Sequence, residues 1–212
     1  MGERNPDLEG RFIGGLIIAA ALGAVLLMMH HPTSIGGADD GLLLHDWSNV
    51  FVDGGMMICL FAFLFAFAIL ARRLGEEHLV VRAGGMAFTG GMTALAAAAL
   101  INGFVVGGLR AAMPDLPAAA LQFLTLGLLN QTLALLGLAL VSAATALWAF
   151  RMLRLDAMTK AAGGLGIAMA FLAGWWLLAG GGTFGLYPAT YAMIVFAAWS
   201  LIIATQLIRG RL

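Results

Sequence analysis

Three polar residues near the start of one long apolar stretch could do chemistry together. His45, Asn49 and Asp53 are spaced i, i+4 and i+8, which stacks them along one face of a helix. Asp46 borders the same strip. Asp53 is the only carboxylate that we place inside a membrane-spanning stretch, where an ionisable group is costly unless it has a partner. We therefore expect Asp53 to be the key acid of a functional site.

Two further histidines, His30 and His31, end the preceding apolar stretch at the same expected membrane level. Imidazole and carboxylate groups suit zinc, copper or iron, so His30, His31, His45 and Asp46 are candidate metal ligands. Histidines at a membrane interface can also simply contact water, and this alternative stays open. His78 lies in a charged loop on the opposite side, RRLGEEH, and is expected to be solvated.

Other stretches bring polar groups to the same half of the membrane. Arg110 is the natural countercharge for Asp53, because opposite charges inside a membrane protein stabilise each other. Amide side chains come from two more stretches, at Asn102, Asn130 and Gln131. Together with Asp53, Asn49 and His45 these residues form the candidate ligand-binding site.

Composition places the whole chain in lipid. Of its 212 residues, 62% are hydrophobic and 10% are charged, and the mean hydropathy is +0.97. A soluble domain is typically about 45–50% apolar and about 25% charged. The formal net charge of zero argues against nucleic acid as a partner. The single cysteine, Cys59, excludes a disulfide within the chain.

Six apolar stretches are long enough to cross the hydrocarbon, which takes roughly 20 helical residues. Their backbone polar groups must bond internally, so these stretches are expected to be helices. The sequence therefore predicts an all-α integral membrane protein, a single domain over residues 1–212 built as a bundle of six transmembrane helices. The predicted helices cover about 12–30, 47–71, 83–109, 119–150, 161–181 and 186–208.

The basic residues fix the expected orientation. With the N-terminus inside, the outer loops hold only Arg110, and a strong excess of Arg and Lys marks cytoplasmic loops. Both termini are then cytoplasmic, and residues 31–46 form an outer loop. The single lysine, Lys160, against ten arginines, with abundant Ala and Gly, favours a GC-rich bacterial genome, and we expect the protein in the bacterial inner membrane. The inner segments hold Arg4, Arg11, Arg72, Arg73, Arg82, Arg151, Arg154, Lys160, Arg209 and Arg211.

We prefer an outward-facing polar site that binds or transports a small solute, a proton or a metal. In helix count and packing motif, including Ala20 and Ala24 at small-xxx-small spacing, the chain superficially resembles the substrate-binding subunits of energy-coupling-factor vitamin importers. That resemblance implies that the first outer loop caps a pocket.

Two alternatives stay open. The chain could be a non-catalytic subunit of a larger membrane complex, with other membrane subunits or itself as partners besides the bilayer. It could also be a membrane enzyme, or a haem or metal protein that uses the outer histidines His30, His31 or His45. The sequence carries no nucleotide-binding loop or redox cysteine pair that identifies a cofactor.

Overall fold

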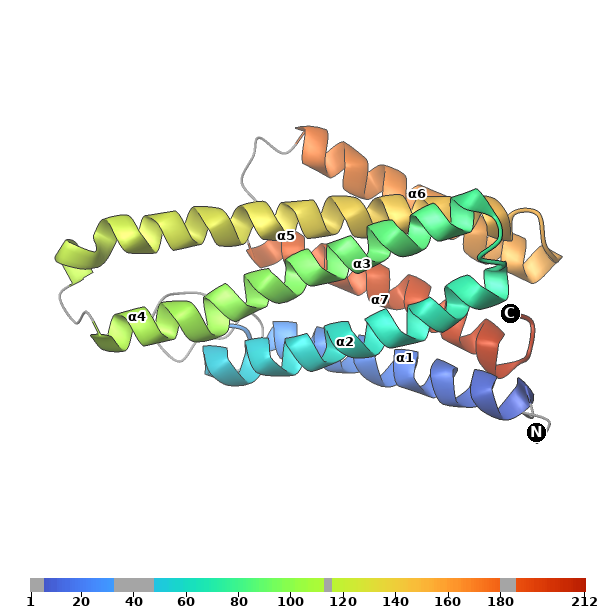
Figure 1. Cartoon of the computed structure of the whole chain (residues 1–212), viewed down its shortest axis with the longest axis horizontal. Helices are drawn as coiled ribbons and strands as arrows, with labels where there is room; N and C mark the ends of the chain where they lie inside the picture. Colours follow the sequence, from blue (N-terminus) through green and yellow to red (C-terminus); the bar gives the residue numbers. More distant parts are fainter. Residues whose placement is uncertain (1–5, 33–47, 113–115, 180–185) are drawn as a thin grey trace.

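The computed structural model describes residues 6–32, 48–112, 116–179 and 186–212, and their regular elements are all helical (Figure 1). The all-helical prediction is therefore confirmed for the described residues. In chain order the elements are α1 (Pro6–Met29), α2 (Asn49–Leu74), α3 (Leu79–Leu100), the π-helical turn η1 (Ile101–Val105), α4 (Val106–Ala112), α5 (Leu116–Met152), α6 (Ala157–Ala179) and α7 (Leu186–Ile208).

Several of these helices can cross a membrane. Among the described residues, five helical segments are long and apolar enough to do so, namely Leu8–Met29, Asn49–Leu74, Leu79–Leu109, Ala119–Met152 and Pro188–Ile208. In α6 the apolar part that qualifies, Ala157–Phe171, is shorter. The chain is a multi-pass membrane protein.

Local sequence explains where α2 begins and ends. Ser48 is its N-cap, and the Ser48 side chain accepts a hydrogen bond from the backbone N–H of Phe51 at 3.3 Å. Gly75 ends the helix in the left-handed region at φ 94°, which glycine adopts without a steric penalty.

The third predicted helix differs from the expectation of one regular helix over 83–109. The structure starts it at Leu79 and interrupts it with η1, in which the hydrogen bonds reach one residue further back along the chain. Such single turns of π-helix are rare and are frequent at functional sites. Here the turn lies beside α2, next to Asp53.

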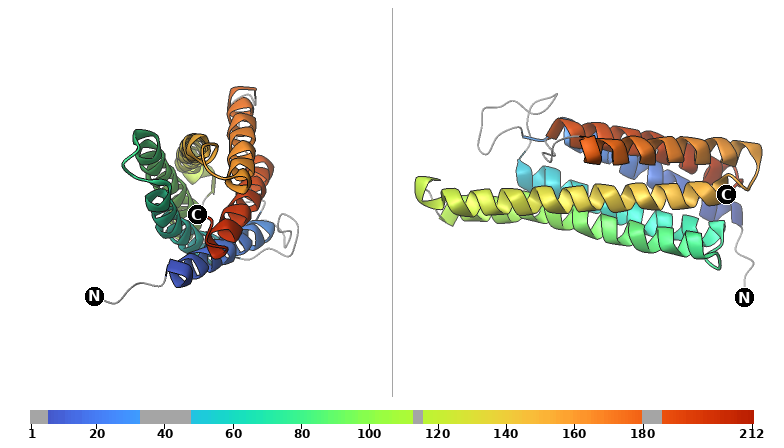
Figure 2. Two further views of the ribbon diagram at one scale, coloured as in Figure 1. Left: turned by 90° about the vertical axis from the view of Figure 1, so that its right-hand side faces the viewer. Right: turned by 90° about the horizontal axis from the view of Figure 1, so that it is seen from above.

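The helices surround a common interior. α1 packs against α2 and α7, α2 against α3, and α3 against α5, while α6 lies mainly along α5 (Figures 1 and 2). α3 and α5 approach each other closely at two glycines, since a Cβ atom at Gly91 would lie 3.0 Å from the carbonyl oxygen of Gly137. In lipid, helices associate through such close packing of small residues.

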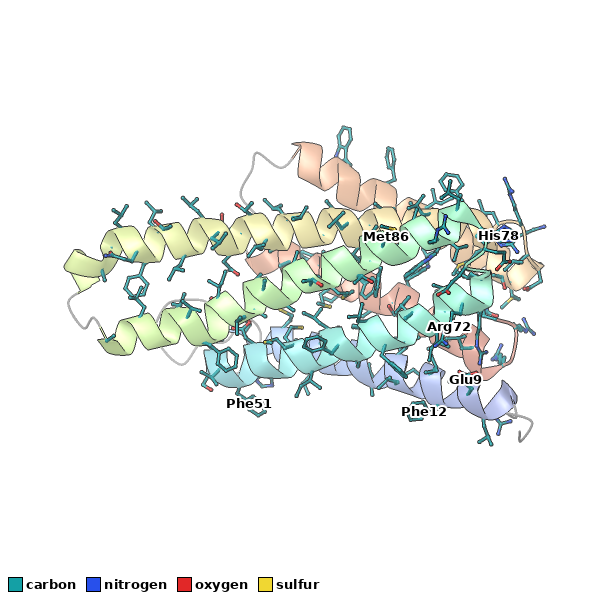
Figure 3. All side chains as sticks on the ribbon, viewed as in Figure 1. Glu9, Phe12, Phe51, Arg72, His78 and Met86 are labelled. Carbon is teal, nitrogen blue, oxygen red and sulfur yellow. The ribbon has the colours of Figure 1, made fainter. Side chains whose placement is uncertain are left out.

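Both termini lie at one end of the bundle, together with the α2–α3 and α5–α6 connections (Figure 1). Arg72 and His78 are at this end as well (Figure 3). Polar contacts tie the end together, since Arg73 is 3.6 Å from the Glu9 carboxylate of α1 and donates to the backbone oxygen of Leu212 at 2.7 Å. We call this the arginine end.

Asp156 caps the start of α6 at the same end. Its carboxylate accepts hydrogen bonds from the Thr159 hydroxyl and from the backbone N–H groups of Thr159 and Met158. These bonds, that of the hydroxyl above all, hold the pKa of Asp156 below its usual value.

The glycine contact between α3 and α5 gives a packing prediction. Gly91→Ala places a methyl group 2.9–3.0 Å from Val141 and the Gly137 backbone. The helices must then separate, and we expect a loss of about 1–3 kcal/mol in unfolding free energy. The measurement is denaturation of the purified protein followed by circular dichroism.

The matched control is Gly85→Ala on the same helix, where a Cβ atom meets nothing within 4 Å. This variant should be as stable toward denaturation as the parent or slightly more stable, because alanine has a higher helix propensity than glycine. Equal stability of the two variants would contradict the packing account.

Candidate binding cavity

Three polar side chains from three separate segments meet near the start of α2. Asp53 is on α2, Asn102 is in η1, and His31 follows α1. The Asn102 amide donates to Asp53 Oδ2 at 2.8 Å and lies 3.3 Å from His31 Nε2, which itself is 3.9 Å from Asp53 Oδ1. Asp53 is 5% exposed, so the carboxylate is held inside the protein by this arrangement, which we call the polar trio.

Hydrogen bonding assigns the His31 tautomer. His31 Nδ1 is 2.9 Å from the carbonyl oxygen of Pro32, which can only accept, so Nδ1 carries the proton. The Asn102 atom facing both partners is the amide nitrogen, since a carboxylate oxygen of Asp53 accepts from it. His31 Nε2 therefore accepts from the Asn102 amide with its single lone pair, at 3.3 Å.

The sequence brings Asn102 close to Asp53 through the residue that follows it. A Cβ atom at Gly103 would lie 2.6 Å from Asp53 Cβ and 3.3 Å from the backbone oxygen of Asn49. Only glycine lets the η1 backbone approach α2 this closely. The π-helical turn and Gly103 together aim the Asn102 amide at the carboxylate.

The polar trio lies at the edge of a cavity of about 440 Å³ enclosed by α1, α2, α3, α5 and α7. Asn130 and Gln131 of α5 add two amide groups to its lining. The remaining lining is apolar apart from backbone, and comprises Met28, Pro32, Met56, Leu60, Phe63, Met92, Leu95, Ala98, Ala99, Ala134, Leu138, Val141, Ala189, Ala192, Met193 and Phe196.

A layer of aromatic rings lies between this cavity and the arginine end. Phe63 and Phe196 line the cavity and meet edge to face at 5.2 Å between ring centroids. Behind them Phe67 is stacked on Trp148 and Trp199, at 5.7 Å and 5.6 Å. All three of these rings are buried, so the cavity is closed toward the arginine end.

The two indole rings are held in place by hydrogen bonds to neighbouring helices. Trp148 Nε1 donates to the carbonyl oxygen of Val81 at 3.2 Å, and Trp199 Nε1 donates to that of Ala162 at 3.1 Å. A buried indole N–H normally needs such a partner. The aromatic layer is therefore a fixed part of the bundle.

The structure brings together part of the predicted site. Asp53, Asn102, Asn130, Gln131 and His31 all line or edge one cavity. Asn49 lies one turn before Asp53 on α2, and its side-chain oxygen is buried with no hydrogen-bond partner among the described residues. The Asp53 carboxylate is hydrogen-bonded to Asn102 from another helix, whereas the predicted strip placed the neighbours of Asp53 on the same helix as Asp53.

Other predicted residues are not placed. His45 and Asp46 lie outside the described residues. Arg110 belongs to α4, but its side chain is not described, so its role as countercharge stays a prediction. His30 directly follows α1, is half-buried, and is not part of the cavity lining.

The metal-ligand prediction also stays open. Within the ranges that the structure describes, no group of three or more His, Cys, Asp or Glu side chains is arranged to hold a metal ion. Two of the four predicted ligands, His45 and Asp46, fall outside those ranges.

Sequence reasoning missed four methionines in the lining, one from each of four helices. For two of these methionines, the sequence spacing could have predicted a position beside the site. Met28 precedes His31 by three residues and Met56 follows Asp53 by three, a spacing that puts each pair on one helical face. The aromatic layer, which also includes Phe88 of α3 at 5.1 Å from Trp148, had no such signal, because its rings come from four different helices.

Comparison with known proteins finds no matching family model, no matching curated protein and no matching solved structure.

The position of Gly103 gives a prediction about the polar trio. Gly103→Ala inserts a methyl group 2.6 Å from Asp53 Cβ, which must push η1 away from α2 and break the Asn102–Asp53 hydrogen bond. We expect a loss of about 1–3 kcal/mol in unfolding free energy.

Gly107→Ala in α4 is the control, since a Cβ atom there meets nothing within 4 Å. Both variants are measured by denaturation of the purified protein. If Gly103→Ala were as stable as Gly107→Ala, the close approach of η1 to α2 would be refuted.

Proposed function

We propose that this chain is a bacterial inner-membrane protein that crosses the membrane six times, keeps both termini in the cytoplasm, and binds or transports a small solute through an outward-facing cavity. The excess of Arg and Lys at the end that carries both termini supports this orientation, because basic loops stay in the cytoplasm. α6, with 23 residues, is the sixth span in this proposal.

The observation that carries the proposal is the polar trio at the edge of a closed-bottomed cavity. Placing Asp53, Asn102 and His31 inside the apolar bundle is costly, and such groups in a membrane protein usually serve a ligand or ion. The cavity of about 440 Å³ falls within the range of ligand sites, about 300–1,000 Å³. Asp53 is the key acid, and Asn102 and His31 orient it.

The aromatic layer supports the outward direction. It lies between the cavity and the arginine end, which favours access to the polar trio from the opposite side. Transport then requires the rings around Phe67 to move apart, whereas binding alone does not. The proposed site therefore works as an outward-open state of an alternating-access cycle.

A second candidate function, a subunit of a larger membrane complex, is favoured by the length of α5. Its 37 residues extend about 55 Å at about 1.5 Å each, against a hydrocarbon core of about 30 Å. The start of α5 and α4 project beyond the ends of α1, α2 and α7 (Figures 1 and 2). Leu121, Leu124, Leu128 and Leu129 are exposed there, a surface that a partner subunit could cover.

Cysteine accessibility tests the outward-facing cavity. In a Cys59→Ala background, Ala189→Cys places one thiol in the cavity lining. A membrane-impermeant maleimide added to intact spheroplasts should label it. Lys160→Cys, an exposed position at the arginine end, should be labelled only after the membrane is permeabilised.

Labelling of Lys160→Cys in intact spheroplasts would show that the arginine end faces outward, the reverse of the proposed topology. Failure to label Ala189→Cys from outside, with normal labelling in permeabilised cells, would place the opening on the other face. Either result removes the proposed function.

A further inference from the structure

We infer that the ligand of this cavity is an amphiphilic organic cation, a protonated amine that carries an apolar body. The inference rests on the proposed function, since it assumes that the cavity takes up a small solute. It follows from two properties of the lining, its charge at one edge and its apolar surface elsewhere.

The charge of the lining selects a cation. Asp53 is the only carboxylate among the described lining residues, and none of them is Arg or Lys. His31 donates from Nδ1 to the Pro32 carbonyl oxygen and faces the Asn102 amide nitrogen with Nε2. The other polar lining groups, Asn102 of η1 and Asn130 and Gln131 of α5, are neutral amides, and α7 contributes apolar side chains. Among the described lining residues, no positive side chain would compensate an anion that faces the Asp53 carboxylate.

The geometry of the polar trio fits an ammonium group. The Asn102 amide occupies Asp53 Oδ2 and the single lone pair of His31 Nε2. Asp53 Oδ1, which is 3.9 Å from His31 Nε2, is the other oxygen of the carboxylate. An ammonium nitrogen can lie about 2.7–2.9 Å from Oδ1, the usual length of a charge-assisted hydrogen bond.

The rest of the lining selects an apolar body. Below the polar trio the cavity presents thioethers such as Met56 and Met193 and the rings of Phe63 and Phe196. A sugar or another polyhydroxylated solute would leave its hydroxyl groups without partners there, which costs free energy. Methionine side chains adapt to ligands of different shape. The site therefore suits a class of amines rather than one shape.

A bare metal ion fits less well. The polar trio offers one imidazole and one carboxylate, 3.9 Å apart and both already in contact with Asn102. The methionines do not gather at this point, because Met92 precedes Asn102 by ten residues, roughly 15 Å along the helix. A soft metal would need several sulfur ligands together.

A matched set of probes tests the inference. The set is 4-phenylbutylammonium, the neutral 4-phenylbutanol and the anionic 4-phenylbutyrate, with ethylammonium as a cation that lacks the apolar body. Each is titrated against the full-length protein in lipid nanodiscs by calorimetry. In parallel, each is tested for protection of Ala189→Cys, in the Cys59→Ala background, from the maleimide.

The expected result is selective binding of the amphiphilic cation. 4-Phenylbutylammonium should bind about tenfold more tightly than 4-phenylbutanol, the difference between a charge-assisted and a neutral hydrogen bond. Ethylammonium and 4-phenylbutyrate should bind more weakly still. Asp53→Asn should reduce the ammonium-to-alcohol ratio to about one, whereas Glu77→Gln, which removes an exposed carboxylate at the arginine end, should leave it unchanged.

Several outcomes would overturn the inference. They are equal affinity for the ammonium and the alcohol, preference for the carboxylate, or an unchanged ratio in Asp53→Asn. The ratio in the parent protein decides the matter even if Asp53→Asn does not fold. If no probe binds while Ala189→Cys is still labelled from outside, the cation inference fails and the outward cavity stands. If Ala189→Cys is not labelled from outside, the proposed function fails.

Discussion

The site depends on one constraint, that a carboxylate placed inside a membrane bundle must be hydrogen-bonded. Asp53 is 5% exposed and accepts a bond from Asn102 at 2.8 Å. Leaving such a group without a partner in hydrocarbon would cost several kcal/mol. Two local features follow from this need. The chain leaves regular α-helix at η1, and it places a glycine at Gly103, because both are required for the Asn102 amide to reach the carboxylate.

The same bundle separates two environments along its length. Near Asp53 the interior is polar at one edge and open enough for a ligand, whereas near Phe67 it is filled by stacked rings. Close glycine contacts between α3 and α5 hold the wall of the cavity together. At the far end Arg73 joins α1, α2 and the C-terminal residues. Our proposal of an outward-open binding protein combines two of these features. One is a cavity closed at one end, and the other is the basic cluster beyond the closed end.

The sequence predicted the helices better than it predicted which side chains of different helices are in contact. Apolar length alone predicted helices, and the cost of burying a charge singled out Asp53. Helical spacing correctly puts Asn49 one turn from Asp53, but it cannot show which helix supplies the next neighbour. The pairing of Asp53 with Asn102 depends on a π-helical turn that no residue pattern in INGFV announces. The aromatic layer likewise needs the packing of α2, α3, α5 and α7, which periodicity within one helix does not contain.

A double-mutant cycle between Asp53 and Asn102 tests the central claim most directly. Asp53→Leu, Asn102→Leu and the double variant are compared with the parent by reversible unfolding in mixed detergent. We predict a coupling energy of about 1–2 kcal/mol, with Asn102→Leu alone less stable than the double variant, because it leaves the carboxylate without its donor. Effects that add within about 0.3–0.5 kcal/mol would show that the two side chains do not depend on each other, and would contradict the account.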